Sequence, residues 1–283
     1  MDVILGIDVG GSATKIVGLD PGGTVISMRR IRAEDPVTSL YGALGNYLNA
    51  SRLRLSDVRR VVLTGVGASF AEGDVFGLPT CRVDEFSACA AGALSLSGQD
   101  AALVVSMGTG TAFLRAERGG TVEHLCGSGI GGGTLGGLCR KLVDMERFRQ
   151  IQKLAEQGDL SHVDLAIRDI VRNPAATLDP SLTAANFGNL AEDASPGDLA
   201  AGVVNLVLQA IGTMTVLAAR CCDTKTVVLT GSVTTLPQAR ANFENFGKLY
   251  GLRYIIPENA TFATAIGAAL CSMREKGICY ETV

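Results

Sequence analysis

Short apolar runs alternate with amphipathic stretches along the chain. β-Branched residues dominate the runs in the first third, which is typical of buried strands. These runs predict strands at residues 3–8, 13–19, 24–31, 60–65 and 79–83. Pro36 opens a stretch with Leu40, Leu44 and Leu48 on one face, which predicts a helix to about Ala50. A helix of small residues is predicted over 84–96.

At Asp100 the pattern starts again. Further strands are predicted at 101–106, 112–116, 121–125, 226–230 and 252–256. Further helices are predicted after the glycine-rich segment up to about 142, then at 145–171, 200–219, 236–250 and from about 262, with a loop over 173–189. The order strand, glycine turn, strand, strand, helix therefore occurs twice, at 3–50 and at 101–142.

This repetition predicts an α/β protein of two related halves with a ligand cleft between them. We expect a first domain over residues 1–98 and a second over 99–283. The last helix could return to pack on the first half.

Composition and charge narrow the class of protein. The chain has 283 residues, of which 47% are hydrophobic and 19% charged, so it can bury a sizeable core. A net charge of −3 and a pI near 5.5 argue against nucleic acid or an anionic membrane as partner. The apolar stretch 200–219 contains Asn205, Gln209 and Thr213, which lipid disfavours, so we expect a helix buried in the core or at a subunit interface.

The chain has eight cysteines, and no pair of them has C-x-x-C spacing. Several lie in apolar stretches, where a free cysteine behaves as a small hydrophobe. The N-terminus lacks the basic and apolar regions of a signal peptide. These features lead us to expect a cytoplasmic protein.

Candidate chemistry begins at the turn after the first strand. Asp8 ends that strand, and Gly10, Gly11 and Ser12 follow it, with Lys15 beyond the turn. Glycines let backbone N–H groups approach an anion closely, and a carboxylate beside them can hold Mg²⁺. An aspartate in an ordinary turn is the alternative, and Lys15 could face a phosphate or simply solvent.

Two further glycine turns follow buried strands. They are Gly108-Thr109-Gly110-Thr111 and Gly231-Ser232. The former could be a plain hairpin turn, but its match to the first turn favours a second phosphate contact. Three such turns predict a cleft that binds a nucleotide polyphosphate and its metal.

A glycine-dense run follows at 127–137. It contains G-x-G-x-x-G, but no acidic residue follows at the Rossmann distance, and the chain has no P-loop motif. We expect Gly131, Gly132 and Gly133 to begin a helix whose N–H groups face a ligand anion or the adenosine ribose. A flexible loop is the alternative.

Glu85 and His124 are the remaining candidates. Glu85 follows a predicted strand at the start of a helix, where an acid is common, and the sequence alone favours that role over a general base. His124 ends a predicted strand beside the glycine run and could reach the cleft. His162, the other histidine, lies in a polar stretch.

These motifs together resemble those of the type II pantothenate kinases, a family of the actin-like superfamily of sugar kinases and heat-shock chaperones. The resemblance covers residues 3–270. Its motifs are GIDVGGSATK at 6–15, VDEF at 83–86, GTGT at 108–111, GSGIGGGTLGGL at 127–138, LTAANFG at 182–188, GS at 231–232 and NATFATAIGAAL at 259–270.

The resemblance implies two actin-like, ribonuclease-H-like halves with an ATP cleft between them. It implies ATP-dependent phosphorylation of pantothenate, the first step towards coenzyme A, by a homodimer. Glu85 would be the catalytic base and would contact the substrate with Thr111 and His124. Asp8 would hold Mg²⁺ through water, with the three glycine turns and Gly131 to Gly133 around the nucleotide.

One departure from the family affects the substrate. His124 stands where members usually carry an arginine that helps to hold the acidic substrate, and histidine lacks the bidentate guanidinium fork. Arg115, Arg118 and Arg140 are candidates to replace it.

The alternatives are a related kinase for another small hydroxyl compound, an inactive nucleotide-binding regulator, and an ATPase activator of radical dehydratases. The last class needs cysteines that hold an iron–sulfur cluster.

Overall fold

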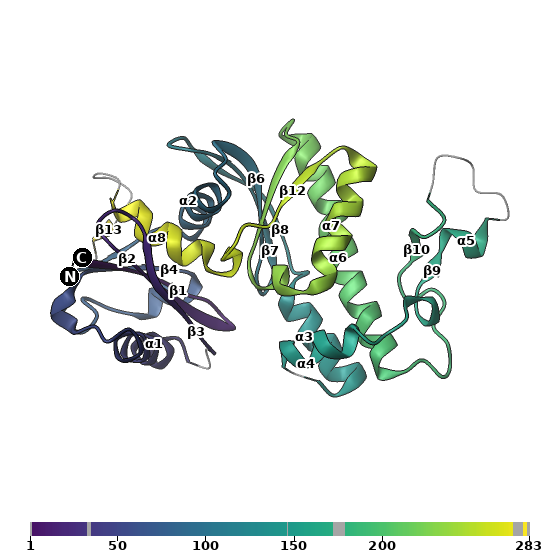
Figure 1. Ribbon diagram of the computed structural model, residues 1–283, viewed down its shortest axis with the longest axis horizontal. Helices are drawn as coiled ribbons and strands as arrows, with labels where there is room; N and C mark the ends of the chain where they lie inside the picture. Colours follow the sequence, from purple (N-terminus) through teal and green to yellow (C-terminus); the bar gives the residue numbers. More distant parts are fainter. Residues whose placement is uncertain (1, 33–34, 146, 172–178, 274–279, 282–283) are drawn as a thin grey trace.

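The computed structural model describes residues 2–32, 35–145, 147–171, 179–273 and 280–281. Two β-sheets lie side by side along an elongated molecule, with two helices between them (Figure 1). We call the part built on the first sheet lobe 1 and the part built on the second sheet lobe 2.

The sheet of lobe 1 has the order β13-β5-β4-β1-β2-β3. The central strand β1 is buried along its whole length, as its apolar sequence VILGIDV requires. The strand bounds are β1 Val3–Val9, β2 Ala13–Leu19, β3 Val25–Arg32, β4 Val58–Thr64, β5 Thr80–Arg82 and β13 Tyr280–Glu281.

The sheet of lobe 2 has the order β12-β11-β6-β7-β8. The strand bounds are β6 Ala101–Met107, β7 Thr111–Glu117, β8 Val122–Ser128, β11 Thr226–Thr230 and β12 Arg253–Ile255. In each lobe the first strand pairs antiparallel with the second and parallel with the fourth of its five main strands. The prediction of two related halves is confirmed by this shared topology.

Helices cover the outer faces of both sheets. Helix α1 (Pro36–Ser51) packs on the sheet of lobe 1, where Leu40, Leu44 and Tyr47 are buried. Asp35 caps this helix by accepting a hydrogen bond of 2.6 Å from the N–H of Thr38. Lobe 2 is covered by α3 Gly132–Val143, α4 Phe148–Ala155, α6 Pro196–Cys221 and α7 Pro237–Tyr250.

Two helices are exchanged between the lobes. Helix α2 (Glu85–Ser97) follows β5 of lobe 1 but packs on the sheet of lobe 2, and α8 (Ala263–Met273) follows lobe 2 but packs on the sheet of lobe 1. The two helices cross in close contact between the lobes (Figure 1). A Cβ atom at Gly92 or Gly267 would overlap a backbone carbonyl oxygen of the other helix, so glycine permits this crossing.

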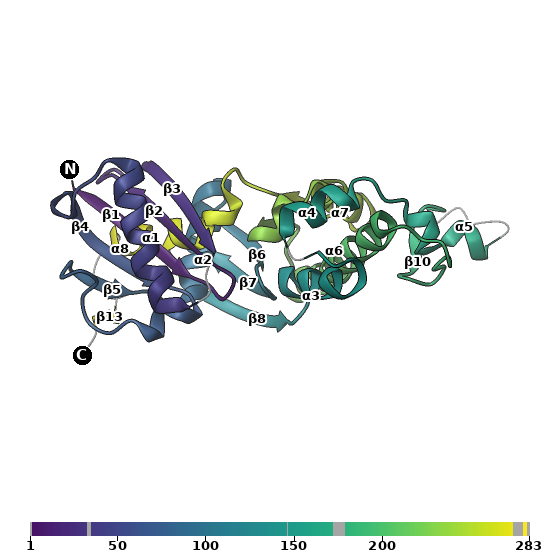
Figure 2. The ribbon, with the colours of Figure 1, turned by 90° about the horizontal axis from the view of Figure 1, so that it is seen from below.

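Short elements connect the main ones. They are the 3-10 turns η1 Leu55–Asp57, η2 Val66–Phe70, η3 Leu160–His162, η4 Ser232–Thr235 and η5 Ala260–Phe262, the strands β9 Leu165–Ala166 and β10 Thr183–Ala185, and helix α5 Ile167–Ile170. The β9–α5–β10 segment protrudes from the far end of lobe 2 in both views (Figures 1 and 2).

The prediction of a continuous helix over 145–171 is wrong. The helix ends at Ala155, and the backbone of Gly158 then packs against Gly197 so closely that a Cβ atom would overlap it. Asp159 caps the following 3-10 turn, and β9 begins at Leu165. In the predicted loop 173–189, residues 172–178 lie outside the described residues, and β10 is a short strand.

Helix α6 is the long apolar helix foreseen at 200–219. Its length and composition alone would let it span a membrane, but 67% of its most apolar window is buried within the protein. Val203, Val207 and Ile211 lie in the core of lobe 2, while Leu217 is 55% exposed. The prediction of a buried helix is confirmed for most of its length.

A contact at the start of α6 predicts how the stability of the protein depends on pH. Asp198 accepts hydrogen bonds from the N–H groups of Asp159 and Ser195, and its Oδ2 lies 3.2 Å from His162 Nδ1. This contact with Asp198 raises the pKa of His162. Because the folded pKa is the higher one, the stabilisation is present below the unfolded pKa of histidine and is lost as pH rises through the folded pKa. We expect an NMR titration of His162 to give a pKa above that of a free histidine.

The matched control is Asp198→Asn, which removes the charge that faces His162. The pKa of His162 should fall in that variant towards the value of an unpaired imidazole. An unchanged titration curve would contradict the assigned contact.

Candidate active site

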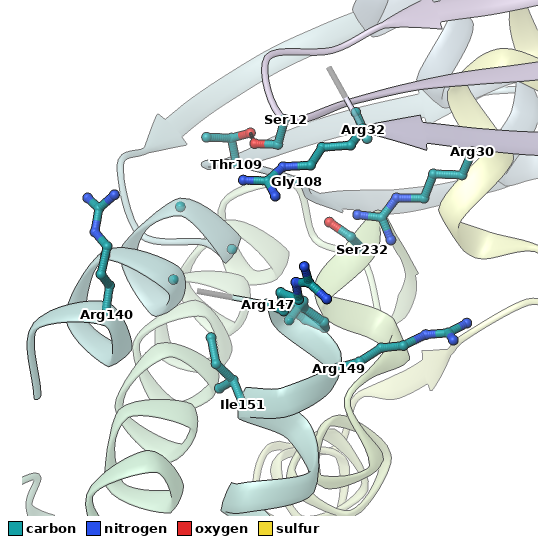
Figure 3. A pocket seen from close by; sticks show the side chains of 16 residues that line it. Ser12, Arg30, Arg32, Gly108, Thr109, Arg140, Arg147, Arg149, Ile151 and Ser232 are labelled. Atoms are coloured by element: carbon teal, nitrogen blue, oxygen red, sulfur yellow. Dashed lines mark hydrogen bonds between the residues drawn. The ribbon is translucent and has the colours of Figure 1, made fainter. Parts of the chain in front are cut away.

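A cavity of about 890 Å³ lies where the two lobes meet. Its walls include parts of all four predicted glycine segments, together with the end of β3 and the start of α4 (Figure 3). The predicted site residues that line it are Ser12, Gly108, Thr109, Gly132, Gly133 and Ser232. Segments that are more than 200 residues apart in the sequence therefore meet at one place.

The first loop joins β1 to β2 beside this cavity. Asp8 and Lys15 are opposite each other in the β1–β2 pair, and Lys15 Nζ lies 3.0 Å from Asp8 Oδ2. Both side chains are largely buried, and the second carboxylate oxygen of Asp8 faces two glycines. A Cβ atom at Gly65 would lie 2.6 Å from Asp8 Oδ1, and one at Gly10 would lie 3.7 Å from it. Glycine at position 65 thus lets the backbone pack closely against the Asp8 carboxylate.

The second loop is the tight hairpin between β6 and β7, which is the hairpin turn that the sequence analysis considered for GTGT. Thr109 Oγ1 lies 2.9 Å from Ser12 Oγ of the first loop, which joins the two lobes across the cleft. Thr111 is buried, and its hydroxyl donates to the carbonyl oxygen of Ile130. Gly110 leaves room for Ser128, because a Cβ atom there would lie 2.7 Å from the carbonyl oxygen of Ser128.

The glycine run begins α3 as expected, but its N–H groups have partners within the protein. The N–H of Gly132 donates to Gly108, and that of Gly133 donates to Thr109. A Cβ atom at Gly131 would lie 2.6 Å from the carbonyl oxygen of Thr109. The prediction that Gly132 and Gly133 offer their N–H groups to a ligand is therefore wrong. These glycines instead let the helix start pack against the second loop.

The third turn follows β11 of lobe 2. Gly231 has a φ of +88°, a left-handed conformation that favours glycine, and a Cβ atom there would overlap the backbone of Met107. Its N–H donates to the carbonyl oxygen of Ala260. Ser232 then faces the cavity beside Gly108.

Glu85 is the first residue of α2, and Asp84 caps this helix by accepting from the N–H of Ser87. The side chain is exposed, yet the surrounding protein atoms partly remove water from its carboxylate. This desolvation is the main reason that the pKa of Glu85 is raised. The negative charge of Asp8 raises it further, while the positive charge of Lys15 opposes the shift. A carboxylate with a raised pKa is a stronger proton acceptor near neutral pH. Glu85 lies outside the cavity described above.

His124 lies on β8 and is exposed. Its imidazole stacks on the ring of Phe86, with 4.4 Å between ring centroids and 10° between planes. Since Phe86 follows Glu85 directly in the sequence, His124 lies beside the start of α2.

The sequence analysis missed most of the basic side chains of the cavity. Five arginines line it, and the analysis considered only Arg140 among them. The others form two R-x-R pairs, Arg30 with Arg32 on β3 and Arg147 with Arg149 at the start of α4 (Figure 3). Alternation along the predicted strand could have placed Arg30 and Arg32 on one face. Nothing in the sequence brings the second pair to the same cavity.

The fold has close counterparts among solved structures. An activator of 2-hydroxyisocaproyl-CoA dehydratase from Clostridium difficile with bound ADPNP is similar over 96% of this chain and 94% of its own, with a TM-score of 0.70 and 18% identity. A glucokinase of the ROK family from Streptomyces griseus, in complex with glucose and AMPPNP, is similar over 95% of this chain and 98% of its own. Its TM-score is 0.62 and its sequence identity is 15%. These similarities show that the chain has a two-lobed, actin-like fold.

Residues 99–243 match the family described as Fumble. A type II pantothenate kinase of Staphylococcus aureus is 30% identical over 264 residues, which cover 89% of this chain and 97% of that protein. The chain belongs to the type II pantothenate kinase family.

Proposed function

We propose that this protein transfers the γ-phosphoryl group of ATP to the primary hydroxyl of pantothenate and so begins coenzyme A synthesis. The observation that carries the proposal is the position of Glu85 near the first loop, where the charges of Asp8 and Lys15 both shift the pKa of its carboxyl. A proton acceptor beside a phosphate site is what phosphoryl transfer to an alcohol requires. The names of the relatives supply pantothenate as the acceptor.

In the proposed reaction, Glu85 accepts the proton of the substrate hydroxyl while a bond forms between that oxygen and the γ-phosphorus. The bond between the γ-phosphorus and the bridging oxygen breaks, and ADP leaves with the electron pair. Gly10 to Ser12 and Gly108 to Thr111 would hold the phosphates from the two lobes, with Lys15 near them. Most of the rate enhancement would then come from positioning and charge stabilisation.

We assign Mg²⁺ to the neighbourhood of Asp8. The Asp8 carboxylate lies near the end of β1 beside the first loop and supplies oxygen ligands of the kind that Mg²⁺ prefers. Among the described residues, no group of three or more histidines, cysteines or carboxylates could hold a metal alone, so phosphate oxygens and water would complete its shell. When bound, the ion neutralises charge on the phosphates.

We further propose a cytoplasmic homodimer with no nucleic acid or membrane partner. The exposed Leu217 of α6, together with Ile170 and Leu190 near the protruding β9–α5–β10 segment, fits a subunit interface on lobe 2. The net charge of −3 fits the absence of a polyanionic partner.

A second candidate is phosphorylation of a different small hydroxyl compound. The observation that favours it is His124, which lies beside Glu85 where the family's arginine would contact the acidic substrate. A neutral imidazole binds a carboxylate less strongly than a guanidinium does.

Incubation with MgATP and a panel of alcohols decides between the two. We expect mass spectrometry to detect phosphopantothenate, with ADP formed in equal amount. Phosphorylation of another alcohol with pantothenate unchanged would favour the second candidate. ATP binding without any phosphorylated product would favour an inactive regulator.

A further inference from the structure

The cavity between the lobes is strongly basic. The described residues that line it include Arg30, Arg32, Arg140, Arg147 and Arg149 and no acidic side chain. Two of these arginines come from β3 of lobe 1, and the other three from α3 and the start of α4 in lobe 2. Figure 3 shows Arg30 and Arg32 reaching from β3 towards Ser232 and Gly108, with Arg147 reaching towards them from the opposite wall.

The two R-x-R pairs have no acidic partner in the part of the chain that the structure describes. Within the described residues, Arg30, Arg32, Arg147 and Arg149 form no ion pair with a carboxylate. The pKa of Arg30 is lowered mainly by its burial and to a smaller extent by the positive charge of Arg149. Positive charges gathered in a concave site without acidic partners are costly unless an anion lies between them.

The ligand that fits this arrangement carries several negative charges and reaches both lobes. Guanidinium groups bind phosphate oxygens through paired, charge-assisted hydrogen bonds. The same cavity includes Ser12, Gly108 and Thr109 of the two phosphate loops. A chain of phosphates is therefore the natural counterion of the four arginines.

We propose that Arg30 and Arg32 from one lobe, and Arg147 and Arg149 from the other, bind the polyphosphate of the nucleotide and select nucleoside triphosphates over monophosphates. This inference rests on the proposed function, because it takes ATP as the ligand. It adds specificity residues that lie outside the glycine motifs. The bound phosphates would also remove the repulsion between the two pairs and so favour approach of the lobes.

The test is calorimetry with ATP and with AMP on folded variants. The variants are the doubles Arg30→Gln/Arg32→Gln and Arg147→Gln/Arg149→Gln. The matched control is Arg59→Gln/Arg60→Gln, which makes the same charge change on exposed residues of β4. We expect each cavity variant to bind ATP about 10–100-fold more weakly, as expected for loss of charge-assisted hydrogen bonds. AMP binding should change by less than about threefold.

The outcomes separate the inference from the proposed function. If the wild type binds ATP and both cavity variants bind it as the control does, the arginines have no role and the inference fails alone. If AMP binding falls as much as ATP binding, the arginines contact the nucleoside, which also overturns the inference. If the wild type binds no nucleotide with magnesium present, the proposed function itself fails. Circular dichroism of each variant confirms that it is folded.

Discussion

Replacement of Glu85 by glutamine is expected to lower kcat by about 10²–10⁴-fold, the usual contribution of a general base. Glutamine keeps the size of the side chain but cannot accept the proton of the substrate hydroxyl. ATP affinity should stay close to that of the wild type, because Glu85 lies outside the cavity that holds the phosphate loops. Steady-state kinetics and calorimetry on the same preparation measure the two effects.

The pH profile gives a second readout for Glu85. The pKa of this carboxyl is raised, mainly by desolvation and by the charge of Asp8, and the base acts only when deprotonated. Activity of the wild type should therefore fall as pH drops through a value above the ordinary glutamate pKa, and this limb should be absent in Glu85→Gln.

Asp84→Asn is the matched control, because it makes the same change of carboxylate to amide one residue earlier. Asparagine can still cap α2, so this variant should keep most of the activity. Full turnover in Glu85→Gln would show that another group accepts the proton.

The second large effect is expected at the crossing of α2 and α8. Alanine at Gly92 or Gly267 would place a Cβ atom on a backbone carbonyl oxygen of the other helix. The helices would have to separate, and overpacking of this kind typically costs about 1–3 kcal/mol. Since α2 begins at Glu85, the shift should also lower kcat. Thermal unfolding of each variant measures the loss of stability.

Gly42→Ala and Gly45→Ala provide the control for that experiment. Both glycines are exposed in α1, and no atom lies within 4 Å of a Cβ atom at either position. Alanine there should raise the stability of the helix by up to about 1 kcal/mol. Equal melting temperatures for Gly45→Ala and Gly267→Ala would contradict the close crossing.

The central strands could be predicted because their apolar, β-branched runs reflect burial on both faces. Strand β1 and the hairpin β6–β7 lie within a residue or two of their expected positions. The sequence analysis expected that the last helix, α8, could pack on the first half, but it did not predict that α2 packs on lobe 2. An apolar helix face shows that a helix is covered, but it does not show which sheet covers it. The end of α4 depends on the contact of Gly158 with Gly197, which are 39 residues apart.

The candidate site was predictable only in part. Glycine turns after strands led to Ser12, Thr109 and Ser232, which line the common cavity. The N–H groups of Gly132 and Gly133 have protein partners that only the folded loops reveal. The arginine pairs lie 115 residues apart or more, and their meeting depends on how the two lobes face each other.

The central claim is that loops from both lobes hold one ATP with its γ-phosphate facing Glu85. A crystal structure with a non-hydrolysable ATP analogue, magnesium and pantothenate tests it most directly. We expect phosphates between Gly10–Ser12 and Gly108–Thr109, and the substrate hydroxyl within hydrogen-bond distance of Glu85. A nucleotide bound elsewhere, or a hydroxyl out of reach of Glu85, would contradict the claim.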